Sequence, residues 1–132
     1  MLERGRRQVL NFGHTVGHAV EACSGYTLLH GEAIAIGMAA EASLAEATGL
    51  ARSGLRRRVL DLLEPYELPA TLPDTLTCDR LLEAMHSDKK VRAGAIRFAL
   101  PAAIGAMAHS ADGAWTVEAG PDEIRSALDA NR

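Results

Sequence analysis

The chain has 132 residues, a formal net charge of −3 and 48% hydrophobic residues, which suits one domain with its own core. This charge gives no general signal for nucleic-acid binding, no apolar stretch is long enough to cross a bilayer, and the N-terminus lacks the layout of a signal peptide. Cys23 and Cys78 lie in separate segments and form neither a disulfide framework nor a CxxC motif, so a reducing cytoplasm is the expected location.

The first predicted element is a helix that runs through Arg7, Asn11, His14 and His18. These residues are separated by four, three and four positions, the intervals that return a side chain to one helical face. An ordinary exposed helical face carries Lys, Glu and Arg and rarely concentrates Asn and two His. A single buried histidine is more often a core residue than a ligand, but the stripe as a whole predicts a functional site.

The second predicted helix begins near His30 and ends near Gly49, a residue type that favours helix C-termini. Its residues are apolar and small almost all the way round, which is typical of a helix buried on most faces. The positive helix end disfavours a protonated imidazole at His30 and so favours the neutral form that binds metal. With His14 and His18 one turn apart, a third imidazole from this segment can complete a metal site for zinc or a similar ion.

Two acidic residues near these histidines are expected to support the site rather than to bind metal. Glu21 lies three residues after His18 and can orient that imidazole by accepting a hydrogen bond. Glu32 points about 160° away from His30 on a helix. It is therefore expected to be a supporting or packing residue.

Two more helices are predicted before the C-terminal third of the chain. Ser53 can open the third helix, three prolines then mark an irregular connection, and Thr77 or Asp79 can cap the fourth. Their apolar side chains recur at helical spacing and are expected to face inward. On the third helix these are Leu55, Val59, Leu62 and Leu63, and on the fourth they are Leu81, Leu82 and Met85.

The C-terminal third is predicted to hold short strands over 96–100 and 114–117 and a terminal helix over 121–130. The expected fold class is therefore mainly α, with a small β element near the C-terminus. Residues 1–132 are expected to form a single domain.

Three motifs carry a resemblance to a known family. LNFGHTVGHAVE (residues 10–21), followed by HGEAIAIGM (residues 30–38), resembles the C-terminal half of 3-dehydroquinate synthase. Asp88-Lys89-Lys90 with IRFALP (residues 96–101) is similar to the family's lysine-bearing loop and the strand after it. The likeness covers most of the chain in order and implies the C-terminal helical domain of the dehydroquinate synthase-like fold.

This resemblance implies a sugar phosphate cyclase that uses bound NAD and a divalent metal, usually zinc, with cobalt as the alternative. Such enzymes are lyases that convert 3-deoxy-D-arabino-heptulosonate 7-phosphate to 3-dehydroquinate in the shikimate route to aromatic amino acids. The implied steps are transient oxidation by NAD, elimination of phosphate, re-reduction, ring opening and aldol closure. Family members form homodimers.

The resemblance also implies roles for individual residues. His14 and His30 match two metal-ligating histidines. Arg7, Asn11 and His18 match catalytic groups that hold the substrate and assist proton transfer. These roles suit the planar fork of arginine, the donor and acceptor of asparagine and the near-neutral titration of histidine.

The lysine pair and the remainder of the active site complete what the resemblance implies. Lys89 and Lys90, the only lysines in the chain, match the loop whose lysine contacts the substrate's phosphate or carboxylate. In the family an N-terminal NAD-binding domain supplies a glutamate ligand and another lysine, and no dinucleotide-binding glycine motif occurs in these 132 residues. We therefore expect a fragment with half of an active site, inactive without a nucleotide-binding partner.

Other interpretations stay open. The chain can belong to another sugar phosphate cyclase or to a metal-dependent polyol dehydrogenase, although the continuous NFGHTVGH run favours the synthase over the dehydrogenase. It can also be a non-catalytic helical domain that binds metal or a partner protein. A domain without its nucleotide-binding half is expected to expose apolar surface and to associate.

Overall fold

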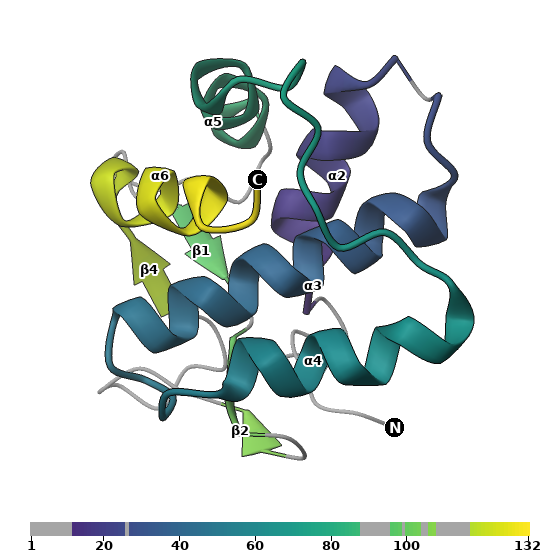
Figure 1. The fold of residues 1–132 in the computed structure, drawn as a ribbon. Helices are drawn as coiled ribbons and strands as arrows, with labels where there is room; N and C mark the ends of the chain where they lie inside the picture. The colour runs from purple at the N-terminus through teal and green to yellow at the C-terminus, as the bar shows by residue number, and fades with distance from the viewer. Residues whose placement is uncertain (1–11, 26, 88–95, 99, 104–105, 108–116) are drawn as a thin grey trace, which may run out of the picture.

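The computed structural model describes residues 12–25, 27–87, 96–98, 100–103, 106–107 and 117–132 (Figure 1). Helices predominate, with two short antiparallel strand pairs toward the C-terminus, so the predicted fold class is confirmed. The helical elements are α2 (His14–Cys23), α3 (His30–Ala47), α4 (Leu55–Leu63), the 3-10 turn η2 (Glu64–Tyr66), α5 (Cys78–His86) and α6 (Pro121–Asp129). The strands are β1 (Ile96–Phe98), β2 (Pro101–Ala103), β3 (Ala106–Met107) and β4 (Val117–Ala119).

Helix α3 is the central element. It crosses the molecule with α4 along one side and α2 and α6 on the other, and it packs against all three (Figure 1). Every residue from Ala33 to Ala45 except Met38 is buried. The prediction of a helix buried on most faces is confirmed, and α3 is the frame on which its neighbours are placed.

Several predicted helix ends are confirmed. Helix α3 begins at His30, and Gly49 follows its C-terminal end with a φ of 78°, a left-handed conformation that glycine adopts at low cost. Thr77 is the N-cap of α5, and its Oγ1 accepts a hydrogen bond from the Arg80 amide at 3.2 Å. Helix α6 starts at Pro121, where the missing amide hydrogen is not needed.

The prediction of one helix through Asn11 and His14 is wrong. Helix α2 begins at His14, and Gly13 before it has a φ of 85°, which interrupts a right-handed helix. The helical spacing therefore holds from His14 to His18, within α2, and no regular helix continues through Gly13. Arg7 and Asn11 lie outside the described residues.

The third predicted helix differs in two details. Helix α4 begins at Leu55 with Gly54, not Ser53, as its N-cap residue. Leu55 and Val59 are buried and Leu63 is partly buried against the core, but Leu62 is 57% exposed, so the prediction that it faces inward is wrong. On α5 the predicted inward-facing residues Leu81, Leu82 and Met85 are all buried.

The β element completes the core. β1 pairs with β4 in antiparallel register, with Ile96 opposite Ala119 and Phe98 opposite Val117. β2 pairs with β3. The first predicted strand is confirmed over 96–98, whereas the second is shifted to begin at Val117, and residues 114–116 lie outside the described part of the chain.

Two smaller findings concern the cysteines and the membrane. Cys23 and Cys78 are both free, as expected. Among the helices that the structure describes, none combines the length and the apolar character needed to span a bilayer.

Candidate functional site

Three imidazoles come together where α2 meets the start of α3. The ring centroids of His14 and His18 are 5.2 Å apart, those of His14 and His30 are 6.1 Å apart, and those of His18 and His30 are 6.0 Å apart. The predicted cluster of histidines is therefore present. The remaining predicted site residues lie outside the described residues: Arg7, Asn11, Lys89 and Lys90.

A close approach of two backbones sets this geometry. A Cβ added to Gly37 of α3 would lie 2.1 Å from the Gly13 carbonyl oxygen and 2.6 Å from the Gly17 amide nitrogen. Real Cβ atoms do not come that close, so only glycine fits between the two segments. The first turn of α2, with His14, consequently rests directly on α3, the helix that begins with His30.

In both His14 and His30, the Nδ1 atom of the ring lies beside a hydrogen-bond acceptor. His30 Nδ1 lies 3.2 Å from Glu21 Oε1, and His14 Nδ1 lies 3.3 Å from the Phe12 carbonyl oxygen. When each Nδ1–H donates to its acceptor, each Nε2 lone pair remains free to bind a metal ion. The two rings thus have surroundings that suit neutral, Nε2-ligating histidines.

The two acidic residues near the histidines have distinct partners. Glu21 was predicted to orient His18, but its carboxylate lies against Nδ1 of His30, so it supports the histidine on the other helix. Glu32 Oε1 accepts a hydrogen bond from the Leu29 amide at 2.9 Å. It thereby caps the first turn of α3.

The residues present fit part of a zinc site. Imidazoles that share one tetrahedral zinc ion have ring centroids roughly 5 Å apart. The His14 and His18 rings, 5.2 Å apart, match this value, and the His14 and His30 rings are about 1 Å farther apart, at 6.1 Å. Over the described ranges, no group of three or more His, Cys, Asp or Glu side chains is arranged to hold a metal ion. The histidines therefore fit as a partial donor set that needs further ligands.

One residue beside the site, Glu41, was not predicted from the sequence. It is 0% exposed in the middle of α3, and its carboxylate accepts hydrogen bonds from the Gly13 and Val16 amides, both at 3.0 Å. A charged residue is rarely buried without partners. An acid inside an otherwise apolar helix was therefore the signal that could have identified it.

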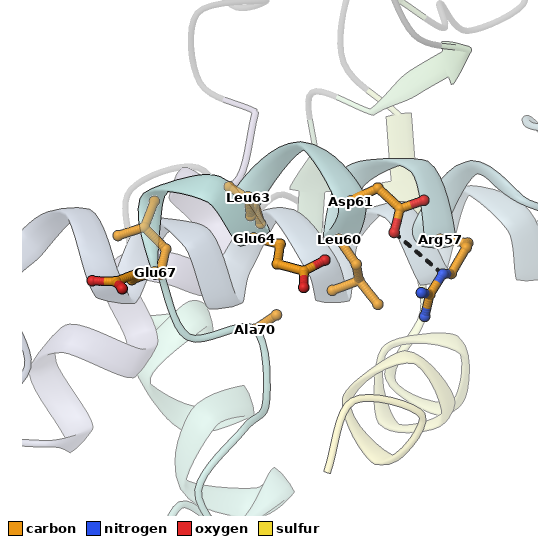
Figure 2. A pocket seen from close by; sticks show the side chains of 8 residues that line it. Arg57, Leu60, Asp61, Leu63, Glu64, Glu67 and Ala70 are labelled. Carbon is orange, nitrogen blue, oxygen red and sulfur yellow. Dashed lines mark ion pairs between the residues drawn. The ribbon is translucent and has the colours of Figure 1, made fainter.

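A surface hollow beside α4 is not part of this cluster. Figure 2 shows the carboxylates around it and the ion pair between Arg57 and Asp61, whose Nε and Oδ1 are 3.3 Å apart. No predicted site residue lines it. The lining residues are Arg57, Leu60, Asp61, Leu63, Glu64, Glu67, Leu68 and Ala70.

The family model and the curated proteins that match this chain point to the same enzyme family. Residues 1–91 match the family described as 3-dehydroquinate synthase C-terminal. The chain is 50% identical over 104 residues to 3-dehydroquinate synthase from Synechocystis sp., which covers 78% of this chain and 29% of that protein. It is 42% identical over 131 residues to the synthase from Symbiobacterium thermophilum, covering 98% of this chain and 35% of that protein. The chain spans about a third of the length of these curated relatives.

Solved structures share the fold. A 2-epi-5-epi-valiolone synthase from Streptomyces hygroscopicus, with NAD+ and Zn2+ bound, is 33% identical with a TM-score of 0.73, covering 92% of this chain and 32% of that one. A 2-deoxy-scyllo-inosose synthase complexed with carbaglucose-6-phosphate, NAD+ and Co2+ has a TM-score of 0.79, covering 92% and 33% of the two chains, and at 22% identity it supports the fold alone. The family match and the curated synthases establish that the chain belongs to the 3-dehydroquinate synthase family.

Proposed function

We propose that this chain supplies the metal- and substrate-binding half of a 3-dehydroquinate synthase. The complete enzyme would convert 3-deoxy-D-arabino-heptulosonate 7-phosphate to 3-dehydroquinate with release of phosphate. The observation that carries the proposal is the convergence of His14, His18 and His30 at the meeting of two helices. It occurs in a chain that belongs to this family.

In this proposal His14 and His30 hold a divalent metal, zinc or cobalt. Their Nδ1 atoms lie beside the Phe12 carbonyl and Glu21, which favours metal binding through Nε2. The bound metal would act as a Lewis acid that makes a substrate hydroxyl easier to deprotonate. The further ligand expected from the resemblance is a glutamate outside these 132 residues.

His18 is proposed to exchange protons with the substrate. It lies one turn beyond His14, its ring is 5.2 Å from that of His14, and it is exposed. A solvent-accessible imidazole can donate and accept protons near neutral pH. A position beside the metal ligands suits a group that moves protons at a metal-bound substrate.

The remaining roles rest on the resemblance. Arg7 and Asn11 are proposed to bind the anionic and hydroxyl groups of the substrate. Lys89 or Lys90 is proposed to bind its phosphate or carboxylate. All four lie outside the described residues, so these assignments stay predictions.

NAD is proposed to bind mainly to a nucleotide-binding region outside these 132 residues. The relative with NAD+ and Zn2+ bound is about three times as long as the part that this chain matches. Without that region we expect no turnover, and we expect the complete enzyme to be a cytoplasmic homodimer.

The test is phosphate release from the heptulosonate phosphate. The chain is mixed with a separately produced nucleotide-binding half of a relative, NAD and zinc. Release should require both parts, disappear in His14→Ala and persist in His86→Ala, which changes an exposed histidine on α5. Absence of release from two halves that demonstrably associate would contradict the proposal.

A second candidate is another sugar phosphate cyclase. It is favoured by the 33% identity and the TM-score of 0.73 to the valiolone synthase. The same phosphate assay distinguishes the two candidates when other phosphorylated sugars are supplied in place of the heptulosonate phosphate. Turnover of one of these sugars, with none of the heptulosonate phosphate, would support the second candidate.

A further inference from the structure

We propose that Glu41 is a positioning residue for the metal site. Its carboxylate, carried by α3, fixes the first turn of α2 and thereby the direction in which His14 points. The inference rests on the proposed function, because it takes His14 and His30 as metal ligands. It adds a residue that does not itself contact the metal.

The two backbone amides that bond to Glu41 belong to residues on either side of His14 in the sequence. Oε1 accepts from the Gly13 amide and Oε2 accepts from the Val16 amide, each at 3.0 Å. Amides at the start of a helix have no acceptor within the helix. Because α2 has no side-chain cap from its own N-cap residue, Glu41 supplies acceptors from a different helix.

The burial of Glu41 indicates that these bonds matter. The side chain is 0% exposed in an alanine-rich stretch of α3. Removing a carboxylate from water is costly unless strong hydrogen bonds replace the lost hydration. A negative charge at a helix N-terminus is favourable as well. The first turn of α2 is thus the element to which this buried charge is coupled.

The same helix also carries His30. Glu41 and His30 belong to one continuous α3, and Gly37 lies between them at the contact with α2. Helix α3 therefore fixes one ligand directly and the other through the Glu41 carboxylate. A change at Glu41 should shift His14 relative to His30 while leaving His30 in place.

The chain contains a matched control, Glu46. Its Oε1 accepts from the Gly54 amide at 2.9 Å and its Oε2 accepts from the Arg56 amide at 2.8 Å. It therefore caps α4 from α3 as Glu41 caps α2, but α4 contains no histidine. The same substitution at Glu46 reports what the loss of such a cap does away from the site.

The experiment compares zinc affinity in Glu41→Gln, Glu46→Gln and the unchanged 132-residue chain. Glutamine keeps one acceptor and turns an NH2 group toward the second amide. Affinity is measured by competition with a chromophoric chelator, at a temperature where circular dichroism shows all three chains folded. We expect Glu41→Gln to weaken zinc binding about tenfold or more and Glu46→Gln to change it less than about twofold. Unchanged affinity in Glu41→Gln, or equal losses in both variants, would overturn the inference.

A second measurement needs no metal. Imidazole resonances of the metal-free chains are followed by NMR, and we expect those of His14 to shift in Glu41→Gln but not in Glu46→Gln, with His30 unchanged in both. If the unchanged chain binds no zinc, its two histidines need the further ligand of the complete enzyme, and the NMR comparison by itself decides whether Glu41 positions His14. If Glu41→Gln does not fold, Glu41→Asp replaces it in both measurements, and an unmoved His14 in that variant would overturn the inference.

Discussion

The starts of α2 and α4 are capped in the same way, by a glutamate carboxylate from α3, but the two caps serve different purposes. Each follows a left-handed glycine, Gly13 with φ 85° or Gly54 with φ 103°, and each receives a glutamate carboxylate from α3. A Cβ on Gly13 would lie 2.6 Å from Met38 Cγ, whereas a Cβ on Gly54 would meet nothing within 4 Å. The cap of α4 therefore only secures a helix end, whereas that of α2 belongs to a tight contact that places histidines.

The largest expected effect comes from Gly37→Ala, which breaks the contact at α2 and leaves that at α4 intact. The added Cβ would meet the Gly13 carbonyl at 2.1 Å, so the two backbones must separate. We expect a loss of about 3 kcal/mol or more in the free energy of unfolding, measured by urea denaturation. The control is Gly31→Ala on the same helix, where nothing lies within 4 Å. Equal stability of the two variants would contradict the described contact.

The next largest losses of stability are expected when the two capping glutamates are removed, in Glu41→Ala and Glu46→Ala. Glu41 is completely buried, so its removal leaves the Gly13 and Val16 amides at the start of α2 without acceptor or water, whereas Glu46 is only partly buried and water can replace it. We expect the free energy of unfolding to fall by about 2–4 kcal/mol for Glu41→Ala and by about 1 kcal/mol for Glu46→Ala. Urea denaturation measures both, and the reverse order would show that burial does not distinguish the caps.

Glu21→Gln is expected to have a smaller effect on stability. It tests whether Glu21 supports His30, the proposed metal ligand on α3. Glu21 Oε1 lies 3.2 Å from His30 Nδ1 and can fix the ring tautomer. We expect zinc affinity to fall about tenfold with little change in stability, since His30 is 59% exposed. Glu123→Gln is the control, because the Glu123 carboxylate accepts a hydrogen bond from the Gly120 amide at the start of α6, a helix without histidine. Equal zinc affinity in the two variants would remove Glu21 from the site.

The smallest expected effect is on the pH dependence of stability, and it involves Asp129, which is distant in sequence from the starts of α2 and α4. Hydrogen bonds from Arg132, and then from Cys78, hold the pKa of Asp129 below its ordinary value of 3.8. The ionised carboxylate therefore stabilises the fold above that value, and the contribution is lost as the pH falls through the lower, folded-state pKa. We expect Asp129→Asn to be slightly less stable than the unchanged chain at pH 7 and equally stable at low pH, by thermal denaturation. Zinc affinity should not change at pH 7.

The sequence predicted the elements that depend on local signals. The burial of α3 follows from its composition, and the N-cap Thr77 follows from residue type. The cluster of His14, His18 and His30 follows from one helical spacing and one family motif.

What the sequence did not predict depends on contacts between distant segments. The break at Gly13 is stabilised by Glu41, which lies 28 residues away. Glu21 faces His30 rather than only its own helix because α2 and α3 cross. Spacing along one helix contains no information about such contacts, so these partners need the packed structure.

The most direct test of the central claim is to count the imidazoles bound to zinc. X-ray absorption spectroscopy of the zinc-loaded chain should show two histidine nitrogens at about 2.0 Å, falling to one in His14→Ala or His30→Ala and staying at two in His18→Ala. Three bound imidazoles in the unchanged chain, or a count that falls in His18→Ala, would contradict the assignment of His14 and His30 as the two ligands.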